Sequence, residues 1–204
     1  MMALAVAAAL GSLASAPGGV IGEAQAGVTF AAVGDSITNA NSVDFARGRV
    51  GDRSWVDHVR PGLSFVGGWA RGGARTADMA AHARPVRADV RVGIAGTNDV
   101  AHGVDFRAIS RNLEAVVLAV GAPRVVVSAV PPRDSSPGVT AELNRRLARF
   151  AEAQGWTFVD AAAGLRSGER FADGMSTDGL HPSREGAEVL AGALSAAISA
   201  AWSM

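Results

Sequence analysis

The stretch that decides the fold is an apolar run that ends in Gly-Asp-Ser: Val28-Thr29-Phe30-Ala31-Ala32-Val33-Gly34-Asp35-Ser36. Its apolar and β-branched residues predict a buried strand, and the Gly-Asp-Ser predicts a sharp turn at the carboxyl end of that strand. Ligands of open α/β sheets bind at this edge. Ser36 is therefore a candidate nucleophile, although Gly-Asp-Ser is also ordinary turn chemistry.

Strand and helix patterns alternate along the rest of the chain. Further strands are expected over residues 63–66, 90–95, 125–130 and 156–160, and helices over 54–59, 76–82, 106–120, about 143–151 and after Ser183. A long glycine-rich loop is expected over residues 161–182. This alternation predicts an α/β fold in which helices cover both faces of a five-stranded parallel sheet, with strand order 2-1-3-4-5.

Four short motifs follow strand ends in this scheme. Gly34-Asp35-Ser36 follows the first strand, Gly72-Gly73 the second and Gly96-Thr97-Asn98-Asp99 the third, while Asp178-Gly179-Leu180-His181 ends the loop after the fifth. The carboxyl ends of parallel strands share one edge of a sheet. We therefore expect the four motifs to converge on one site.

Each motif supplies a group that acyl transfer needs. A serine hydroxyl is a poor nucleophile until a base removes its proton, and histidine suits that task near neutral pH. His181 is the candidate base, and Asp178 is the carboxylate that would orient its ring. The candidate donors to an oxyanion are the backbone N–H groups of Ser36 and Gly73 and the side-chain amide of Asn98. A glycine at position 73 lets the backbone approach a substrate closely.

In order and content, these motifs resemble the GDSL/SGNH hydrolase family, which is named for Ser, Gly, Asn and His in four blocks. The resemblance covers roughly Val28 to Ile198 and implies that Ser36 is the nucleophile, His181 the base and Asp178 its orienting acid. It also implies a flavodoxin-like three-layer α/β/α fold, the SGNH-hydrolase fold, with no metal or organic cofactor. One departure is Gly68, because members often carry Asn five residues before the glycine of the second block.

Each of these residues also has a plain structural interpretation. Ser36 would cap a helix after the strand, Asn98 would brace its own turn through backbone hydrogen bonds, and Asp178 with His181 would form a helix-entry turn. The presence of all four motifs in sequence favours the catalytic interpretation. For other residues near the motifs we expect structural or solvent-facing roles: Asp35, Asp99, His58, His82, His102, Arg71 and Arg75.

The amino-acid composition limits the size class of the protein and the reactions that its side chains can perform. The length of 204 residues, 49% of them hydrophobic, suits one globular domain over residues 27–204. Acidic and basic residues balance at 19 each, so no global charge points to nucleic acid or a membrane surface. The lack of Cys, Lys and Tyr excludes disulfides, thiolate nucleophiles, Schiff bases and tyrosine acid–base roles. No pair of histidines has metal-ligand spacing, so we predict no metal.

Residues 1–26 differ from the rest of the chain. Ala3–Leu10 is a short apolar run, and Ala24-Gln25-Ala26 suits signal-peptidase cleavage before Gly27. The run is too short to span a bilayer, which needs about 20 apolar residues. No basic residue precedes it. We expect residues 1–26 to be a signal peptide or a flexible lead, and the protein to be secreted.

The sequence thus predicts a secreted serine esterase that acts on a small-molecule or glycan ester. The few aromatic residues give no sign of a long lipid tunnel, which favours short acyl chains or acetylated sugars. Two alternatives stay open: acyl transfer to a sugar or alcohol at the same site, and a non-catalytic carbohydrate- or lipid-binding module.

Overall fold

The computed structural model describes residues 27–204, so the leader predicted over residues 1–26 lies outside the described residues. Five parallel strands form one sheet: β1 (Val28–Gly34), β2 (Leu63–Ala70), β3 (Val90–Ile94), β4 (Arg124–Ser128) and β5 (Thr157–Val159). Their order in the sheet is β2-β1-β3-β4-β5. The predicted 2-1-3-4-5 order is confirmed.

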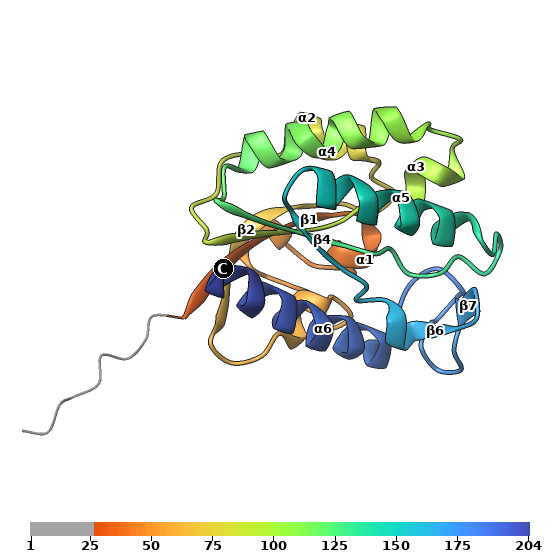
Figure 1. The fold of residues 1–204 in the computed structure, drawn as a ribbon. Helices are drawn as coiled ribbons and strands as arrows, with labels where there is room; N and C mark the ends of the chain where they lie inside the picture. Colours follow the sequence, from red (N-terminus) through yellow and green to blue (C-terminus); the bar gives the residue numbers. More distant parts are fainter. Residues whose placement is uncertain (1–26) are drawn as a thin grey trace, which may run out of the picture.

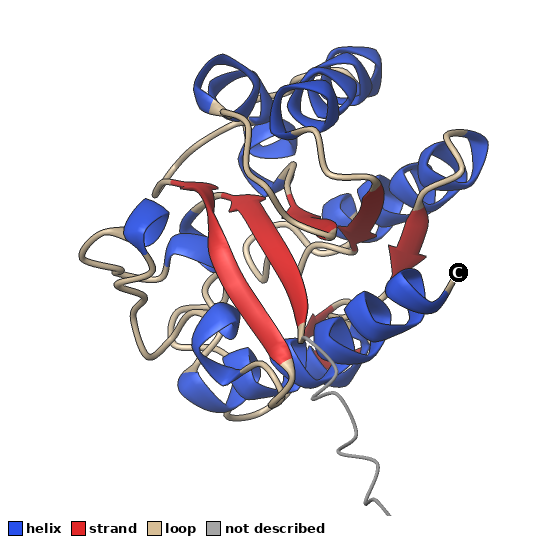
Figure 2. Cartoon of the chain, turned by 90° about the vertical axis from the view of Figure 1, so that its left-hand side faces the viewer, coloured by secondary structure: helices blue, strands red, loops and turns tan. Residues whose placement is uncertain are grey.

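Helices cover both faces of this sheet, which confirms the three-layer α/β/α fold. The α-helices are α1 (Ser36–Asn39), α2 (Thr76–His82), α3 (Thr97–Ala101), α4 (Phe106–Val120), α5 (Val139–Ala153) and α6 (Arg184–Ser203). Three short 3-10 helices are η1 (Phe45–Arg47), η2 (Trp55–His58) and η3 (Ala163–Leu165). Helices α2, α4 and α5 lie on one side of the sheet and α6 lies on the other (Figure 1). Figure 2 shows the strands between these helical layers.

Burial explains why the strands are so apolar. Residues 30–34 of β1 are all buried, as expected for a strand with helices on both faces. Helix α4 buries the stripe Ile109, Leu113, Val116 and Val120 against the sheet. It begins after Asp105, which accepts a 3.0 Å hydrogen bond from the Ala108 N–H, and ends at Gly121 in a left-handed conformation.

Strand β2 runs to Ala70, beyond the expected residues 63–66. The pair Gly67-Gly68, which follows the expected strand, continues β2 through an irregularity in which the β1–β2 register shifts between Phe30 and Ala32. A Cβ on Gly68 would lie 1.9 Å from the carbonyl oxygen of Ala32, and Gly68 has a φ of +151°. Only glycine fits here, which accounts for its presence where the family resemblance suggested asparagine.

The segment 161–182 is not the continuous loop that the sequence suggested. It contains η3 and a small antiparallel hairpin of β6 (Arg166–Ser167) and β7 (Arg170–Phe171). Strands of two residues are too short to show an alternating pattern, so the sequence carries no signal for them.

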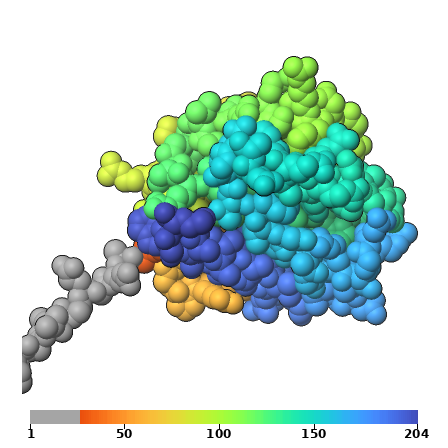
Figure 3. Space-filling view, viewed as in Figure 1, coloured from red at the N-terminus to blue at the C-terminus, as the bar shows by residue number. Residues whose placement is uncertain are grey.

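Both described ends of the chain lie near the amino ends of the strands. Met204 lines a hollow with Arg124 and Thr157, the first residues of β4 and β5. In Figure 3 the dark-blue end of α6 lies beside the red start of β1.

Among residues 27–204, no helix has the combination of length and apolar character needed to cross a membrane.

Candidate active site

Ser36 occupies the turn between β1 and α1. Asp35 caps this one-turn helix, because its carboxylate accepts a 2.9 Å hydrogen bond from the Ile37 N–H. A Cβ on Gly34 would lie 2.2 Å from the Thr38 hydroxyl oxygen, so a glycine is required where the chain turns. The turn leaves Ser36 half-buried at the carboxyl edge of the sheet while its neighbours are buried.

Asp178 and His181 lie in a second, tightly hydrogen-bonded turn just before α6. The Oδ1 atom of Asp178 accepts hydrogen bonds from the N–H groups of Leu180 (3.0 Å) and His181 (2.7 Å). Ser176 closes the turn, because its hydroxyl donates to the His181 carbonyl oxygen (2.8 Å) and accepts from the Gly179 N–H (2.9 Å). The backbone therefore fixes the carboxylate relative to the imidazole ring.

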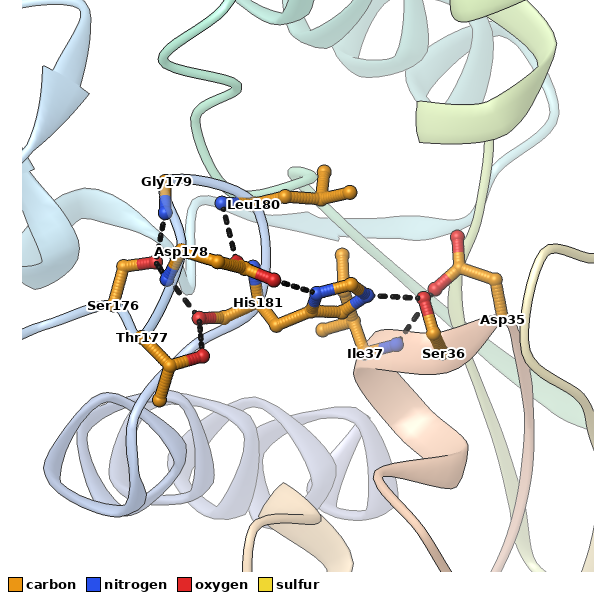
Figure 4. Close-up of polar contacts among 9 residues, drawn as sticks. All are labelled: Asp35, Ser36, Ile37, Ser176, Thr177, Asp178, Gly179, Leu180 and His181. Carbon is orange, nitrogen blue, oxygen red and sulfur yellow. Dashed lines mark hydrogen bonds and ion pairs between the residues drawn. The ribbon is translucent and has the colours of Figure 1, made fainter.

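The two turns meet through side chains (Figure 4). Ser36 Oγ lies 2.9 Å from His181 Nε2, and His181 Nδ1 lies 2.7 Å from Asp178 Oδ2. A carboxylate only accepts hydrogen bonds, so the proton of a neutral ring belongs on Nδ1 and leaves Nε2 free to accept from the serine hydroxyl. This arrangement prepares Ser36 for deprotonation.

The environment keeps Asp178 ionised. Partial burial raises the pKa of the Asp178 carboxyl, but the hydrogen bond from the His181 ring and those from the two backbone N–H groups outweigh burial. Its pKa therefore lies below the usual aspartate value. The side chains of His181 and Asp178 are 36% and 52% exposed, so water has direct access to the histidine.

Asp35 is a fully buried carboxyl group beside this chain of contacts. Its Oδ1 accepts from Ile37, whereas its Oδ2 is buried without a hydrogen-bond partner. Burial raises the pKa of Asp35 to about 7, because the hydrogen bond from Ile37 and the nearby His181 only partly offset the lost hydration. Asp35 therefore stabilises its turn, as expected, although its buried carboxyl group has lost its hydration.

Gly73 lies in the turn between β2 and α2, and Asn98 lies in the first turn of α3, but no hydrogen bond joins either residue to Ser36. Gly73 is exposed with a φ of +72°, and the N–H of nearby Arg71 donates to the carbonyl oxygen of Gly34 at 3.4 Å. Asn98 is buried, and its Nδ2 donates to the Ala74 carbonyl oxygen at 2.9 Å. Within residues 27–204, the N–H of Gly73 donates to no protein group. It is available to a ligand.

The remaining polar residues near the motifs have structural roles. Asp99 accepts from the N–H (2.9 Å) and hydroxyl (2.6 Å) of Thr76, so it braces the start of α2. The imidazole Nδ1 of His102 lies 2.7 Å from the Asn98 carbonyl oxygen, and the ring of His82 stacks on Trp69. The other residues singled out in the sequence lie at or near the surface: His58 is half-buried, and Arg71 and Arg75 are exposed.

A pocket of about 220 Å³ opens beside Ser36. Its lining comprises Ser36, Ile37, Asn39, Ala40, Asn41, Arg53, Gly72, Thr177, Asp178, His181 and Pro182. The sequence did not single out Asn39, Asn41 and Arg53, which belong to a polar loop without a recognisable motif. Larger hollows of about 370 and 510 Å³ contain none of the predicted site residues. Among residues 27–204, no three His, Asp or Glu side chains gather as metal ligands would.

The comparison with known families agrees with this geometry. The profile of the GDSL-like Lipase/Acylhydrolase family matches residues 32–189. The chain therefore belongs to this family, and it is an ester-bond hydrolase. No curated protein sequence matches it significantly.

Several solved structures share the fold at low sequence identity. A catalytic mutant of an acetylxylan esterase from Geobacillus stearothermophilus is 19% identical, with a TM-score of 0.64 over 87% of this chain and 96% of that one. A carbohydrate acetylesterase from Sinorhizobium meliloti is 16% identical, with a TM-score of 0.60 over 85% and 99%. A GDSL-like lipase from Bacteroides thetaiotaomicron is 19% identical, with a TM-score of 0.62 over 85% and 88%.

Proposed function

We propose that this acylhydrolase is a serine esterase that cleaves short-chain carboxylic esters, with acetylated sugars as the favoured class. The observation that carries the proposal is the chain of contacts from Ser36 Oγ through the His181 ring to Asp178, at 2.9 Å and 2.7 Å. The pocket beside Ser36 is small, about 220 Å³, and Asn39, Asn41 and Thr177 line it, which favours a small ester with a polar alcohol. Two structural neighbours, an acetylxylan esterase and a carbohydrate acetylesterase, support the same substrate class.

The proposed reaction has two halves. Ser36 Oγ attacks the ester carbonyl carbon while His181 Nε2 takes the hydroxyl proton, and Asp178 stabilises the resulting imidazolium. The N–H groups of Ser36 and Gly73 and the amide of Asn98 would hold the oxyanion. His181 then donates its proton to the departing alcohol oxygen, which leaves the acyl group on Ser36.

Water completes the cycle. His181 takes a proton from a water molecule that attacks the acyl carbon, and then returns that proton to Ser36 Oγ. The exposure of His181 supports water as the acceptor, because the base is open to solvent. A transferase would instead need to keep water from the acyl-enzyme.

Hydrolysis of p-nitrophenyl esters from acetate to long-chain acids tests the proposal. We expect the acetate to be turned over fastest, and Ser36→Ala to lower kcat by about 10⁴-fold or more while the circular dichroism spectrum is unchanged. Full activity in Ser36→Ala would show that Ser36 is not the nucleophile.

Two other outcomes would favour the alternative functions. A new ester, formed when a sugar acceptor is added, would identify a transferase. A folded protein that binds glycans but does not react with a serine-directed phosphonate would be a binding module.

We also propose that the protein is exported and cleaved before Gly27. The support is the small-residue sequence Ala24-Gln25-Ala26 after an apolar run. Expression of the full chain in a secreting bacterial host tests this, since the mass of the extracellular protein should correspond to a first residue of Gly27. Uncleaved protein that stays in the cytoplasm would contradict the proposal.

A further inference from the structure

Arg53 introduces a positive charge into the pocket beside the candidate nucleophile. The only other charged or titratable side chains of that pocket are Asp178 and His181, which contact each other. Asn39, Asn41 and Thr177 add uncharged hydrogen-bonding groups. The pocket therefore combines a cationic group with several polar groups on one wall.

This arginine has no partner of its own within residues 27–204. Arg47 and Arg49, which precede it in the same loop, both pair with Asp44 at 3.0 Å and 3.1 Å. Arg53 forms no ion pair and no side-chain hydrogen bond, and none of its guanidinium nitrogens is sealed from solvent. Arg53 is half-buried and lines the pocket, and its donors are not used by any protein group that the structure describes.

The backbone around Arg53 is firmly attached to the helix that carries Ser36. The buried hydroxyl of Ser54 donates to the Thr38 carbonyl oxygen at 2.6 Å, and the Trp55 ring N–H donates to the Thr38 hydroxyl at 3.3 Å. On the other side, a Cβ on Gly51 would lie 2.3 Å from the Ala40 carbonyl oxygen, so the two backbones are in direct contact. The backbone of Arg53 is thus held at a fixed place relative to the helix that carries the candidate nucleophile.

The pocket adjoins His181, the residue that the alcohol of an ester would contact. His181 must protonate the departing alcohol oxygen, so the alcohol lies next to His181 in the reacting complex. His181, Thr177, Asp178 and Pro182 line the pocket, whereas Asn98 does not. A group attached to the alcohol would therefore extend toward Arg53.

We propose that Arg53 determines specificity by binding a carboxylate carried on the alcohol part of the ester, as in an acylated sugar acid. The planar guanidinium offers paired donors that match a carboxylate, and an arginine without a protein partner can use all of them for a ligand. Asn39 and Asn41 would bind neighbouring hydroxyl groups. This inference rests on the proposed esterase function, since it assigns the alcohol side of that reaction.

Two acetate esters that differ in one charge test the inference. The first is 3-acetoxybenzoate, whose leaving phenol carries a carboxylate, and the second is its neutral methyl ester. The measurement is the ratio of their kcat/KM values in wild type, Arg53→Gln and Arg53→Lys. The ratio is used because a general loss of activity lowers both kcat/KM values by the same factor and leaves their ratio unchanged. Arg111→Gln is the matched control, since Arg111 is exposed on α4 and lies outside the pocket.

We expect Arg53→Gln to lower the ratio by about fivefold to tenfold, Arg53→Lys to lower it less, and Arg111→Gln to leave it unchanged. Added NaCl should lower the wild-type ratio but not that of Arg53→Gln. An equal ratio in wild type and Arg53→Gln would overturn the role of Arg53. If wild type hydrolysed neither ester while remaining folded, the proposed function itself would fail, which is a different outcome.

Discussion

The side-chain amide of Asn98 donates a 2.9 Å hydrogen bond to the carbonyl oxygen of Ala74. This bond ties the first turn of α3 to the turn that carries Gly73, so two of the predicted oxyanion donors are held together. One amide hydrogen is used in this way. The amide has two hydrogens, and the second remains for an oxyanion.

Asn98→Ala should therefore lower kcat by about 10²–10³-fold with little change in KM, because the donor acts mainly in the transition state. The control is Asn112→Ala, which also removes an asparagine-donated hydrogen bond, here to the Thr76 hydroxyl at 3.0 Å. Steady-state kinetics on p-nitrophenyl acetate compares the two. Equal losses of kcat in both variants would assign Asn98 a structural role only.

Asp178→Asn separates the electrostatic role of the carboxylate from its role in the turn. An asparagine oxygen can still accept from the N–H groups of Leu180 and His181, so the turn should persist. Its amide would donate to His181 Nδ1 and move the ring proton to Nε2, which then cannot accept from Ser36. We expect kcat to fall by about 10²–10⁴-fold.

The matched control for this variant is Asp173→Asn, an exposed carboxylate in the same loop region. It should retain wild-type kcat. If Asp178→Asn also retained kcat, the carboxylate would not be needed to orient or stabilise the histidine.

Asp35 makes stability depend on pH. The pKa of Asp35 is raised from 3.8 to about 7 in the folded protein, so between these values the folded state binds more protons than the unfolded state. The free energy of unfolding should then decrease as pH rises through this window and level off above about 7. Asp35→Asn removes this titratable group, so its free energy of unfolding should not show the decrease. Between pH 5 and pH 8, the stability of Asp35→Asn relative to wild type should therefore rise by on the order of 2 kcal/mol.

Urea unfolding of both proteins at pH 5 and pH 8 measures this difference. Asp57→Asn is the control, since Asp57 is exposed in η2. A stability difference between Asp35→Asn and wild type that is the same at both pH values would contradict a raised pKa for Asp35.

Gly68→Asn introduces the residue that the family often has at this position. It should destabilise the protein by about 2 kcal/mol or more, because the new Cβ would overlap the Ala32 carbonyl oxygen and the backbone conformation suits glycine. Thermal unfolding measures the loss. Gly192→Ala in α6, where a Cβ meets nothing within 4 Å, should be neutral or stabilising. A stable Gly68→Asn variant would mean that β1 and β2 can separate at this point.

The sheet was predictable from the sequence because the inner strands bury both faces, as the apolar run Val125–Val127 of β4 does, and each strand is followed by a helix or a turn signal. The turn of Asp178 and His181 was predictable because both groups lie in one short motif. The position of Arg53 in the pocket was not predictable, because it depends on contacts of Gly51 and Ser54 with α1 that no local sequence pattern encodes. The same holds for the bond between Asn98 and Ala74, which joins α3 to the turn before α2.

The position of the chain ends has a practical consequence. Val28 begins β1 and Met204 lies near the first residues of β4 and β5, whereas Ser36 lies at the opposite edge of the sheet. A tether attached just before Val28 or after Met204 would leave from the far side of the molecule. Enzyme immobilised on a bead or fused to a carrier in this way would present Ser36, the proposed nucleophile, outward and within reach of bulky polymeric substrates.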